Sequence, residues 1–354
     1  MQESRVTIDD VAKASGVSKS AVSYALNGKP GVSERTRAKV LRVAEEMGWR
    51  PSSAAKALSN ARTNNIGLIM TRENELLGGE PWMMELIGGL GVELEKVNYS
   101  LLIRVAGSLE AELEITKDWI ATEAVDGMLV LNVEIGDQRV RLHKQHPEMP
   151  VLFLAHPSLT SGLPTLWSDD VSAARLAVDY LHEQCHACIA RVAGPEELGH
   201  TLIRDQAFID EAMNMGMCYN CLHAGFTPES GADATRRLLS FPEPPTAIIY
   251  DNDAMAVAGL NVAKQEGIKV PEELSIMSWD DSFLCLSVTP SISAIGRNVV
   301  ESGRMAAKLL IDVINGNTVE SVPEPAYELR LRESTGGAPH RGDDDADASQ
   351  RWAV

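Results

Sequence analysis

The sequence predicts an α/β protein in which a small three-helix domain with a helix-turn-helix precedes a two-lobed domain of doubly wound parallel sheets. Three observations lead to this fold class. Two short amphipathic helices joined by a tight turn stand near the amino terminus, and a third follows them. From residue 65 onward, short apolar runs alternate with helical stretches, as in parallel sheets with crossover helices. The first 60 residues are basic, whereas the remainder is acidic.

Charge is divided unevenly along the 354 residues, a length that favours two or three domains. The whole chain carries a net charge of −18, but residues 1–60 hold ten basic and six acidic side chains, a net +4. The remainder holds 22 basic and 44 acidic side chains, a net −22. A basic module on an acidic body suits a protein that touches DNA at one end only, although chance clustering is the simpler alternative. No apolar run approaches a membrane span and no signal peptide is evident, so we expect a cytoplasmic protein.

The first two helices are marked by their caps. Thr7 and Asp10 have the spacing of a capping box, and Gly16 supplies the permissive backbone that a tight turn needs. Ser18 is placed to cap a second helix over residues 19–26. A third amphipathic helix is predicted from Ser33 to a stop at Gly48. This order is typical of a recognition helix that enters the major groove, and a small helical bundle without a ligand is the alternative.

Residues 7–51 resemble the LacI/GalR family of bacterial repressors. The stretch that carries the resemblance reads TIDDVAKASGVSKSAVSYALNGKPGVSERTRAKVLRVAEEMGWRP. The resemblance implies a DNA-binding headpiece over residues 1–51, in which Lys19, Ser20 and Tyr24 face base edges. It also implies a set of phosphate-binding side chains: Thr7, Ser18, Ser23, Asn27, Ser33 and Thr36. Many relatives carry Arg where this chain has Tyr24, so we expect a different base preference at that position.

Residues 52–64 are predicted to form the hinge. Pro51 ends the third helix, and the segment is rich in Ser, Ala and Asn, as linkers are. Alanines and Leu58 make it helix-prone but too short for a stable isolated helix. The family resemblance implies a hinge helix that orders on DNA beside its dimer mate, with Leu58 as the wedge in the minor groove. A flexible tether with a buried leucine is the alternative.

The body, residues 65–334, is predicted to contain two series of strands. The first covers 66–70, 101–105, 127–131 and 151–155, and after a crossing near Trp167 the second covers 188–194, 218–226, 247–251 and 274–281. Two doubly wound lobes with a cleft between them follow from this pattern, and ligands of such folds sit outside the carboxyl ends of the strands. The family resemblance continues to about Ser334 and implies two lobes like those of periplasmic sugar-binding proteins. It also implies that this domain forms the dimer.

The resemblance also implies which residues contact an effector in the cleft. Arg204, Asn252, Asp253 and Asp280 match polar positions of the family, while Trp82 and Trp279 are candidates to stack on a sugar ring or a nucleobase. Two alternatives are simpler: Trp279 as a core residue and Asp253 as a helix cap.

Three departures from the family pattern bear on the effector. His156-Pro157 stands where relatives often carry Asp-Arg, Ala106-Gly107 where polar side chains are common, and Gly296 where many have a polar residue. We therefore expect a small-molecule effector, a carbohydrate or a related metabolite, that differs from the usual hexose.

Four of the five cysteines form two C-x-x-C pairs, Cys185 with Cys188 and Cys218 with Cys221. Such pairs suggest a structural zinc or a redox site, and both pairs fall near the amino ends of consecutive strands. Packed free thiols are the simpler prediction, because Cys188 and Cys221 lie in apolar runs. No metal or cofactor is expected. The polar, acidic stretch 335–354 is predicted to be disordered.

The sequence therefore predicts a transcriptional regulator, most simply a repressor, that binds a palindromic operator as a homodimer, with a tetramer as the open alternative. A sugar-binding transport protein would explain the body but not the headpiece. An enzyme is not expected, because the chain has no nucleophile elbow, P-loop or H-E-x-x-H motif.

Overall fold

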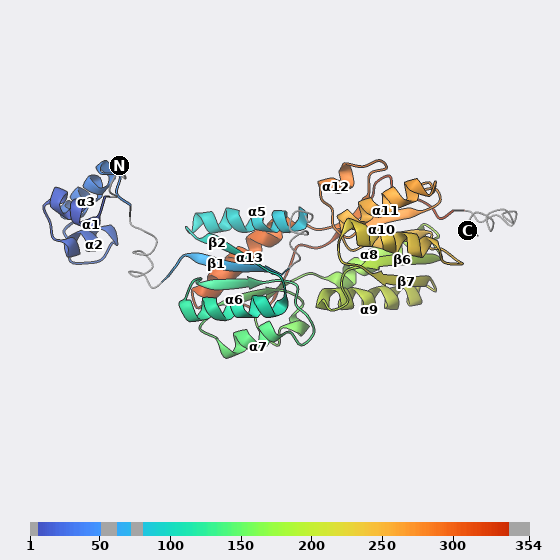
Figure 1. The fold of residues 1–354 in the computed structure, drawn as a ribbon, viewed down its shortest axis with the longest axis horizontal. Coiled ribbons are helices and arrows are strands. Elements are labelled where there is room, and N and C mark those ends of the chain that lie inside the picture. Colours follow the sequence, from blue (N-terminus) through green and yellow to red (C-terminus); the bar gives the residue numbers. More distant parts are fainter. Residues whose placement is uncertain (1–5, 51–61, 72–80, 340–354) are drawn as a thin grey trace. The chain divides into compact units, whose positions relative to one another are not determined.

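The computed structural model describes residues 6–50, 62–71 and 81–339. The chain separates into two compact units, Met1–Thr63 and Asn64–Val354, and the division falls at the end of the predicted hinge. The first unit is a three-helix headpiece (Figure 1). Its helices are α1 (Ile8–Ser15), α2 (Lys19–Leu26) and α3 (Glu34–Glu46). They surround a small core that includes Val11, Val22 and Val40, each fully buried.

The headpiece confirms the predicted caps. The Thr7 hydroxyl and the Asp10 carboxylate form the capping box of α1, and Gly16 ends that helix in the left-handed conformation at φ 67°. Ser18 caps α2, which spans the predicted residues 19–26. Ser33 caps α3, whose last residue lies two positions before Gly48. Local capping interactions therefore set where α1 ends and where α2 and α3 begin.

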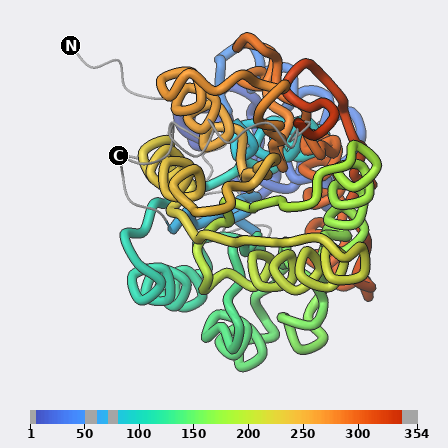
Figure 2. Tube along the Cα trace, turned by 90° about the vertical axis from the view of Figure 1, so that its right-hand side faces the viewer, coloured from blue at the N-terminus to red at the C-terminus, as the bar shows by residue number. Residues whose placement is uncertain are grey.

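The second unit is built from two lobes, each with one six-stranded sheet in the described residues. Lobe 1 has the strand order β11-β5-β4-β3-β1-β2, and lobe 2 has the order β12-β10-β9-β8-β6-β7. Neighbouring strands are parallel except for β12, which pairs antiparallel with β10. Helices cover both faces of the sheets, as Figures 1 and 2 show. The predicted fold class is thereby confirmed.

The elements follow one another in a regular alternation of strands and helices. Lobe 1 is formed by β1 (Asn65–Thr71), α5 (Pro81–Lys96), β2 (Ser100–Ala106), α6 (Leu109–Thr122), β3 (Gly127–Val130), α7 (Gln138–Gln145), β4 (Val151–Leu154), η2 (Pro157–Leu159) and β5 (Thr165–Trp167). Lobe 2 is formed by α8 (Asp170–Glu183), β6 (Cys188–Ala193), α9 (Gly199–Asn214), β7 (Cys218–His223), α10 (Pro228–Leu239), β8 (Ala247–Tyr250), α11 (Asp253–Gln265), β9 (Ser275–Ser278), α12 (Phe283–Leu286) and β10 (Ser293–Gly296). The last elements of the described residues are α13 (Val299–Ile314), β11 (Val322–Pro323) and β12 (Glu328–Arg330).

The chain passes between the lobes at three places. The first passage, between β5 and α8, is the crossing that the sequence predicts near Trp167. The second lies between β10 and α13, because α13 shares a hydrophobic core with α5 and β1 of lobe 1. The third lies between β11 of lobe 1 and β12 of lobe 2. The sequence pattern did not reveal the last two passages, and all three bring polar residues to the region between the lobes.

Two glycines let α5 and α13 approach each other closely. A Cβ atom added at Gly89 would lie 2.0 Å from the carbonyl oxygen of Val300. One added at Gly303 would lie 2.3 Å from the carbonyl oxygen of Leu86. Any larger side chain at either position would push the helices apart. This contact therefore fixes α13, and with it the second passage between the lobes, against lobe 1.

Candidate functional site

The predicted DNA-binding residues lie on two features of the headpiece. Thr7, Ser18 and Ser33 are the N-caps of the three helices, where exposed backbone N–H groups and the helix dipole favour a phosphate. The Ser33 hydroxyl lies 2.9 Å from that of Thr36, in the first turn of α3. Four of the predicted phosphate contacts therefore lie at a helix N-terminus, a placement compatible with the phosphate-binding roles implied by the family resemblance. Asn27 is instead the C-cap of α2, where the helix dipole does not favour an anion.

The predicted base-reading residues share the outer face of α2. Lys19, Ser20 and Tyr24 are exposed, with 45% of Tyr24 accessible, whereas Val22 and Ala25 of the same helix are buried in the headpiece core. The helix can therefore present these three side chains to a groove without disturbing its own packing.

Two further contacts organise this face. The Lys19 ammonium lies 3.0 Å from the carboxylate of Asp9, an exposed pair that phosphate can replace at little cost. The Asn27 amide donates to the Ser23 carbonyl oxygen at 3.0 Å, which holds it at the end of α2. Leu58, the predicted wedge, lies outside the described residues, as does most of the predicted hinge.

A pocket lies between the two lobes and holds about 950 Å³ of empty space, including its open mouth. Its lobe 1 wall is mainly apolar, and its lobe 2 wall is mainly charged. The lobe 1 lining consists of Pro81, Trp82, Leu131, Asn132, Val133, Leu154, Ala155, His156, Leu159 and Leu166. The remaining lining, from lobe 2 and the passages, consists of Ser168, Asp170, His200, Arg204, Phe226, Asp251, Asn252, Asp253, Asp280, Arg297 and Glu324. Five of the six predicted effector residues line this cleft.

Arg204 of α9 is the central cation of the charged wall. Its Nε donates to Asp170 Oδ1 at 3.0 Å, and its Nη1 lies 3.8 Å from Asp251 Oδ2. Burial alone would raise the pKa of Asp170, but the charge of Arg204 holds that pKa below its ordinary value. Burial lowers the pKa of the nearby His200 to about 4, and Arg204 adds to this effect. His200 is therefore neutral near pH 7 and can both donate and accept a hydrogen bond.

Trp279 does not line the cleft, which corrects the expectation that it stacks on a ligand. Only 1% of this side chain is exposed. The Arg204 guanidinium lies 4.3 Å from the centre of the Trp279 ring and occupies the face that a ligand would need. The indole N–H donates to the Tyr327 hydroxyl at 3.1 Å. Trp279 therefore supports Arg204 from beneath, in agreement with the simpler prediction of a core residue.

Asn252 and Asp253 stand at the start of α11, directly after β8. The Asn252 side chain is the helix cap: its oxygen accepts from the Met255 backbone N–H at 2.8 Å, and its nitrogen donates to the Phe226 carbonyl at 2.9 Å. The alternative prediction that Asp253 caps the helix is therefore wrong. Asp253 lines the cleft with 2% exposure, and its Oδ2 has no hydrogen-bond partner among the described residues. Burial raises its pKa.

Sequence reasoning missed the polar residues at the passages between the lobes. Arg297, on the second passage, pairs with Glu324 on the third and donates to the Tyr327 hydroxyl at 2.8 Å. Tyr327 in turn donates to Asp170 Oδ1 at 3.1 Å. These residues connect all three passages at the floor of the cleft. The local sequence signal for these contacts was Asp170, a carboxylate next to the predicted crossing near Trp167. A carboxylate that is buried at such a crossing needs a hydrogen-bonded or charged partner.

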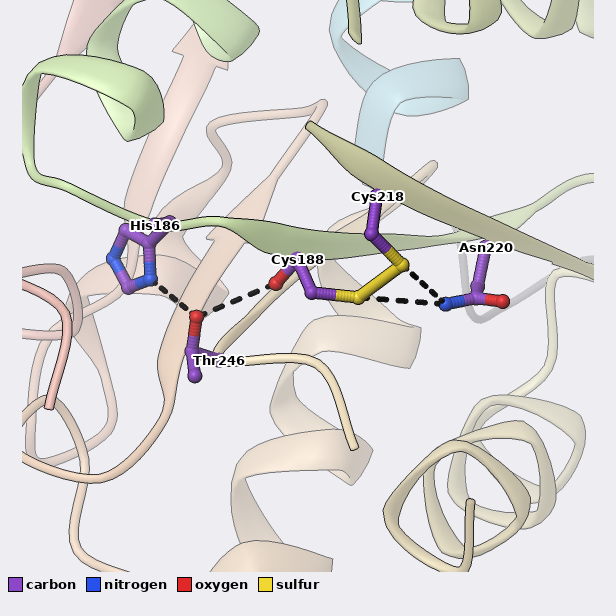
Figure 3. Close-up of a disulfide and its surroundings, with 5 residues drawn as sticks. All are labelled: His186, Cys188, Cys218, Asn220 and Thr246. Atoms are coloured by element: carbon purple, nitrogen blue, oxygen red, sulfur yellow. Dashed lines mark hydrogen bonds between the residues drawn. A yellow bond between two sulfur atoms is a disulfide. The ribbon is translucent and has the colours of Figure 1, made fainter. Parts of the chain in front are cut away.

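The cysteines do not converge on one metal site. Cys188 and Cys218 are register partners on β6 and β7 and form a disulfide, and the Asn220 amide lies beside both sulfurs (Figure 3). Cys221 is three residues from Cys218 on the same strand, so its side chain points to the opposite face of the sheet. The prediction of packed free thiols is therefore wrong for Cys188 and Cys218, and so is the option of four thiolates around one zinc ion, while the redox option remains open.

Within the residues that the structure describes, no helix is both long enough and apolar enough to cross a membrane.

Two family profiles match the chain. The profile described as bacterial regulatory proteins of the lacI family matches residues 7–52, and that of a periplasmic binding protein-like domain matches residues 178–335. The chain is 33% identical to the HTH-type transcriptional repressor CytR of Escherichia coli K12 over 343 residues, which are 96% of this chain and 98% of that protein.

Solved structures agree with these matches. A LacI family transcriptional regulator from Bifidobacterium animalis subsp. lactis is 53% identical, with a TM-score of 0.73, and the match covers 78% of this chain and 99% of that one. The complex of the transcriptional regulator CelR with cellobiose is 28% identical, with a TM-score of 0.71, and the match covers 93% of this chain and all of that one (100%). The chain therefore belongs to the LacI family of bacterial regulatory proteins and is a DNA-binding transcriptional regulator.

Proposed function

We propose that this protein is a cytoplasmic repressor that binds a palindromic operator as a homodimer and is controlled by a small polyhydroxylated effector in the cleft. The effector is a carbohydrate or a related metabolite such as a nucleoside. The observation that carries this proposal is the two-sided lining of the cleft. Lobe 1 offers an apolar wall with Trp82 at its edge, and lobe 2 offers Arg204, Asp253 and Asp280.

A sugar matches such a lining because it has an apolar C–H face and a rim of hydroxyl groups. The unpartnered Oδ2 of Asp253 calls for a hydrogen-bond donor, which a ligand hydroxyl supplies. The ion pair of Arg204 with Asp170 leaves part of the guanidinium to donate to ligand oxygens. The similar regulator CelR was solved as a complex with cellobiose, a disaccharide.

Exposed apolar side chains support assembly into a dimer. On the edge strand β2, Ile103 and Val105 are 37% and 40% exposed. On α12 of lobe 2, Phe283 and Leu286 are each 65% exposed. Large apolar side chains gathered on exposed elements mark interaction surfaces. A homodimer that uses both lobes would cover them and would supply the two-fold symmetry that a palindromic operator requires.

The passages between the lobes suggest how effector binding reaches the headpiece. Arg297, Glu324, Tyr327 and Asp170 hold the passages together beneath the ligand position. A ligand that binds Asp253 and Arg204 on lobe 2 and Trp82 on lobe 1 favours one arrangement of the lobes. The differential affinity needed to couple such states is typically about 1–3 kcal/mol. The lobe arrangement then determines whether two hinges can order together on DNA.

The first experiment is to select operator sequences from a random DNA pool with the purified protein and to measure affinity by mobility shift. We expect a two-fold symmetric consensus whose affinity falls as salt rises. Leu58→Ala should weaken specific binding at least tenfold, because the wedge is lost, whereas Leu41→Ala, an exposed leucine of α3, should not. An asymmetric consensus, or unchanged affinity of the Leu58 variant, would refute the respective part of the proposal.

The second experiment identifies the effector. Sugars and nucleosides are screened by thermal shift, and each hit is tested for its effect on operator affinity. Asp253→Asn should weaken binding of the hit at least tenfold and leave operator affinity in its absence unchanged. The control Asp233→Asn changes an exposed carboxylate of α10 that pairs only with its neighbour Arg236 in the described structure. Equal loss of binding in both variants, or no hit that alters operator affinity, would contradict the proposal.

A further inference from the structure

Three side chains with metal-binding atoms meet at the edge of the lobe 2 sheet. Cys221 and His223 lie on β7, and Asp205 lies on α9, with one ligand atom of each within 4.8 Å of the others. His223 Nε2 lies 2.9 Å from Asp205 Oδ2, and Cys221 Sγ lies 3.6 Å from Asp205 Oδ1. Zinc binds sulfur at about 2.3 Å and nitrogen or oxygen at about 2.0–2.2 Å, so tetrahedral ligand atoms lie roughly 3–4 Å apart. The two distances to the Asp205 carboxylate are already close to these separations.

The fold explains why these residues meet. Cys221 and His223 are two residues apart on one strand, so they point to the same face of the sheet. That face is covered by α9, which carries Asp205 (Figure 1). Strand β7 is the last in the order of its sheet, so the cluster stands at an edge. One-third of the His223 side chain is exposed (33%), which gives an ion a path from solvent.

The charges around the cluster favour a cation. Arg191 is fully buried behind Asp205, and it pairs with both Asp205 and Asp251. With the imidazole counted as neutral, one guanidinium and two carboxylates leave a net charge of −1. A divalent ion that binds the Cys221 thiolate, with release of the thiol proton to solvent, brings the group to neutrality. When Asp205 binds the ion, Arg191 keeps its pair with Asp251, so its positive charge stays compensated.

We propose that Asp205, Cys221 and His223 bind a divalent transition-metal ion of the zinc type, with water in the fourth position. The site is separate from the effector cleft but connected to it. Arg191 donates from Nε and Nη2 to the two oxygens of Asp251, each at 2.7 Å, and Asp251 lines the cleft beside Arg204. When Asp205 moves toward a bound metal, Arg191 pairs with Asp251 only. This change alters the electrostatic potential at the effector position. Metal occupancy therefore modulates operator binding, a consequence that rests on the proposed function.

The test of the site uses the full-length protein, reduced and stripped of metal, and titrated with Co²⁺ and then Zn²⁺. We expect one equivalent to bind, with a thiolate-to-cobalt charge-transfer band that Zn²⁺ abolishes. Cys221→Ser should remove the band, and both Cys221→Ser and His223→Gln should weaken Zn²⁺ affinity at least about tenfold. The matched controls Cys185→Ser and Cys188→Ser should keep band and affinity. His223 is partly exposed, so its variant remains informative if the Cys221 variant folds poorly.

Two results would overturn the metal site: no binding of either ion, or a band that survives in Cys221→Ser and is lost in Cys185→Ser or Cys188→Ser. The connection to the cleft has a separate readout. Zn²⁺ should change operator affinity of the wild-type protein at least threefold and leave that of His223→Gln unchanged. Stoichiometric binding without this change would refute the connection and leave the site, while failure to bind any operator would refute the proposed function instead.

Discussion

The guanidinium of Arg204 lies 4.3 Å from the centre of the Trp279 ring and donates to the Asp170 carboxylate at 3.0 Å. One side chain is thus held by an aromatic face below and by an anion beside it. Both partners are buried, so neither can follow Arg204 into another arrangement without losing contacts. The cation that faces the effector is therefore preorganised, which reduces the entropy lost when a ligand binds.

This arrangement predicts different roles for the two tryptophans. Trp279→Phe removes the indole donor to Tyr327 and weakens the contact with Arg204, so we expect the free energy of unfolding to fall by about 1–3 kcal/mol. Trp82→Phe changes a half-buried residue of the cleft wall. We therefore expect weaker binding of the effector and a fall in the free energy of unfolding of less than about 1 kcal/mol. Urea unfolding and thermal shift with the identified effector measure both quantities. The reverse order of the two stability losses would contradict these roles.

The close contact of α5 and α13 predicts opposite effects for two glycine substitutions. Gly303→Ala places a Cβ against the Leu86 carbonyl, so it should destabilise the protein by about 1–3 kcal/mol. Gly91→Ala is the control: it lies within α5, and nothing stands within 4 Å of its added Cβ. Alanine there should stabilise the protein by about 0.5–1 kcal/mol through helix propensity. The urea unfolding midpoints of the two variants, compared with the wild type, test both effects. A Gly303→Ala variant as stable as the wild type would show that the helices can move apart without cost.

The same pair of helices shows what the sequence can and cannot predict. All eight predicted strands are present. The inner strands β1, β3, β4, β6, β8 and β9 are mostly buried apolar runs that stand out locally, whereas the edge strands β2 and β7 are exposed or half-buried along most of their length. Strand β5 and the strands after β9 were missed: β10 reads SAIG, and β11 and β12 have only two or three residues. The return of α13 to lobe 1 depends on glycine contacts with α5, far away in sequence. No local pattern contains that information.

For the cleft, too, the sequence predicted the residue types but not their contacts. The family resemblance placed Arg204, Asp253 and Asp280 in the lining, but it could not show that Trp279 lies beneath Arg204. Which face of a buried ring is covered depends on the packing of α9 against β9. Likewise the pairing of Arg297 with Glu324 joins two passages whose existence the sequence did not reveal. Residue types at a site are thus more predictable than the contacts they make.

A buried histidine predicts loss of stability in mild acid. His143 of α7 is 2% exposed, its ring nitrogens have no partner among the described residues, and burial lowers its pKa to about 4. Because the unfolded chain binds the proton near pH 6.5 and the folded chain does not, this contribution is complete above pH 6.5 and is lost as the pH falls toward 4. Its full size is about 3 kcal/mol.

His143→Leu should therefore lose less stability than the wild type between pH 7.5 and 4.5. Leucine suits the site because the imidazole ring has no hydrogen-bond partner among the described residues and packs against the Phe153 ring in a T-shaped contact. His146→Gln is the matched control, since His146 stands just beyond the same helix and pairs with Glu148 on the surface. Urea unfolding at several pH values measures the difference. Parallel pH profiles for wild type and His143→Leu would show that the residue does not contribute.

Tyr24 stands where the family resemblance leads us to expect Arg, and the residue is 45% exposed on the outer face of α2. Arg is the usual reader of guanine in the major groove, whereas a tyrosine hydroxyl offers a single donor and acceptor. Tyr24→Arg should therefore change the preferred base at one symmetric pair of operator positions, by about 1–3 kcal/mol of discrimination, more than it changes the affinity for the best site. Tyr24→Phe, which removes only the hydroxyl, should relax the preference at those same positions. Operator selection with the three proteins measures this, and an identical consensus for all of them would show that residue 24 does not read a base.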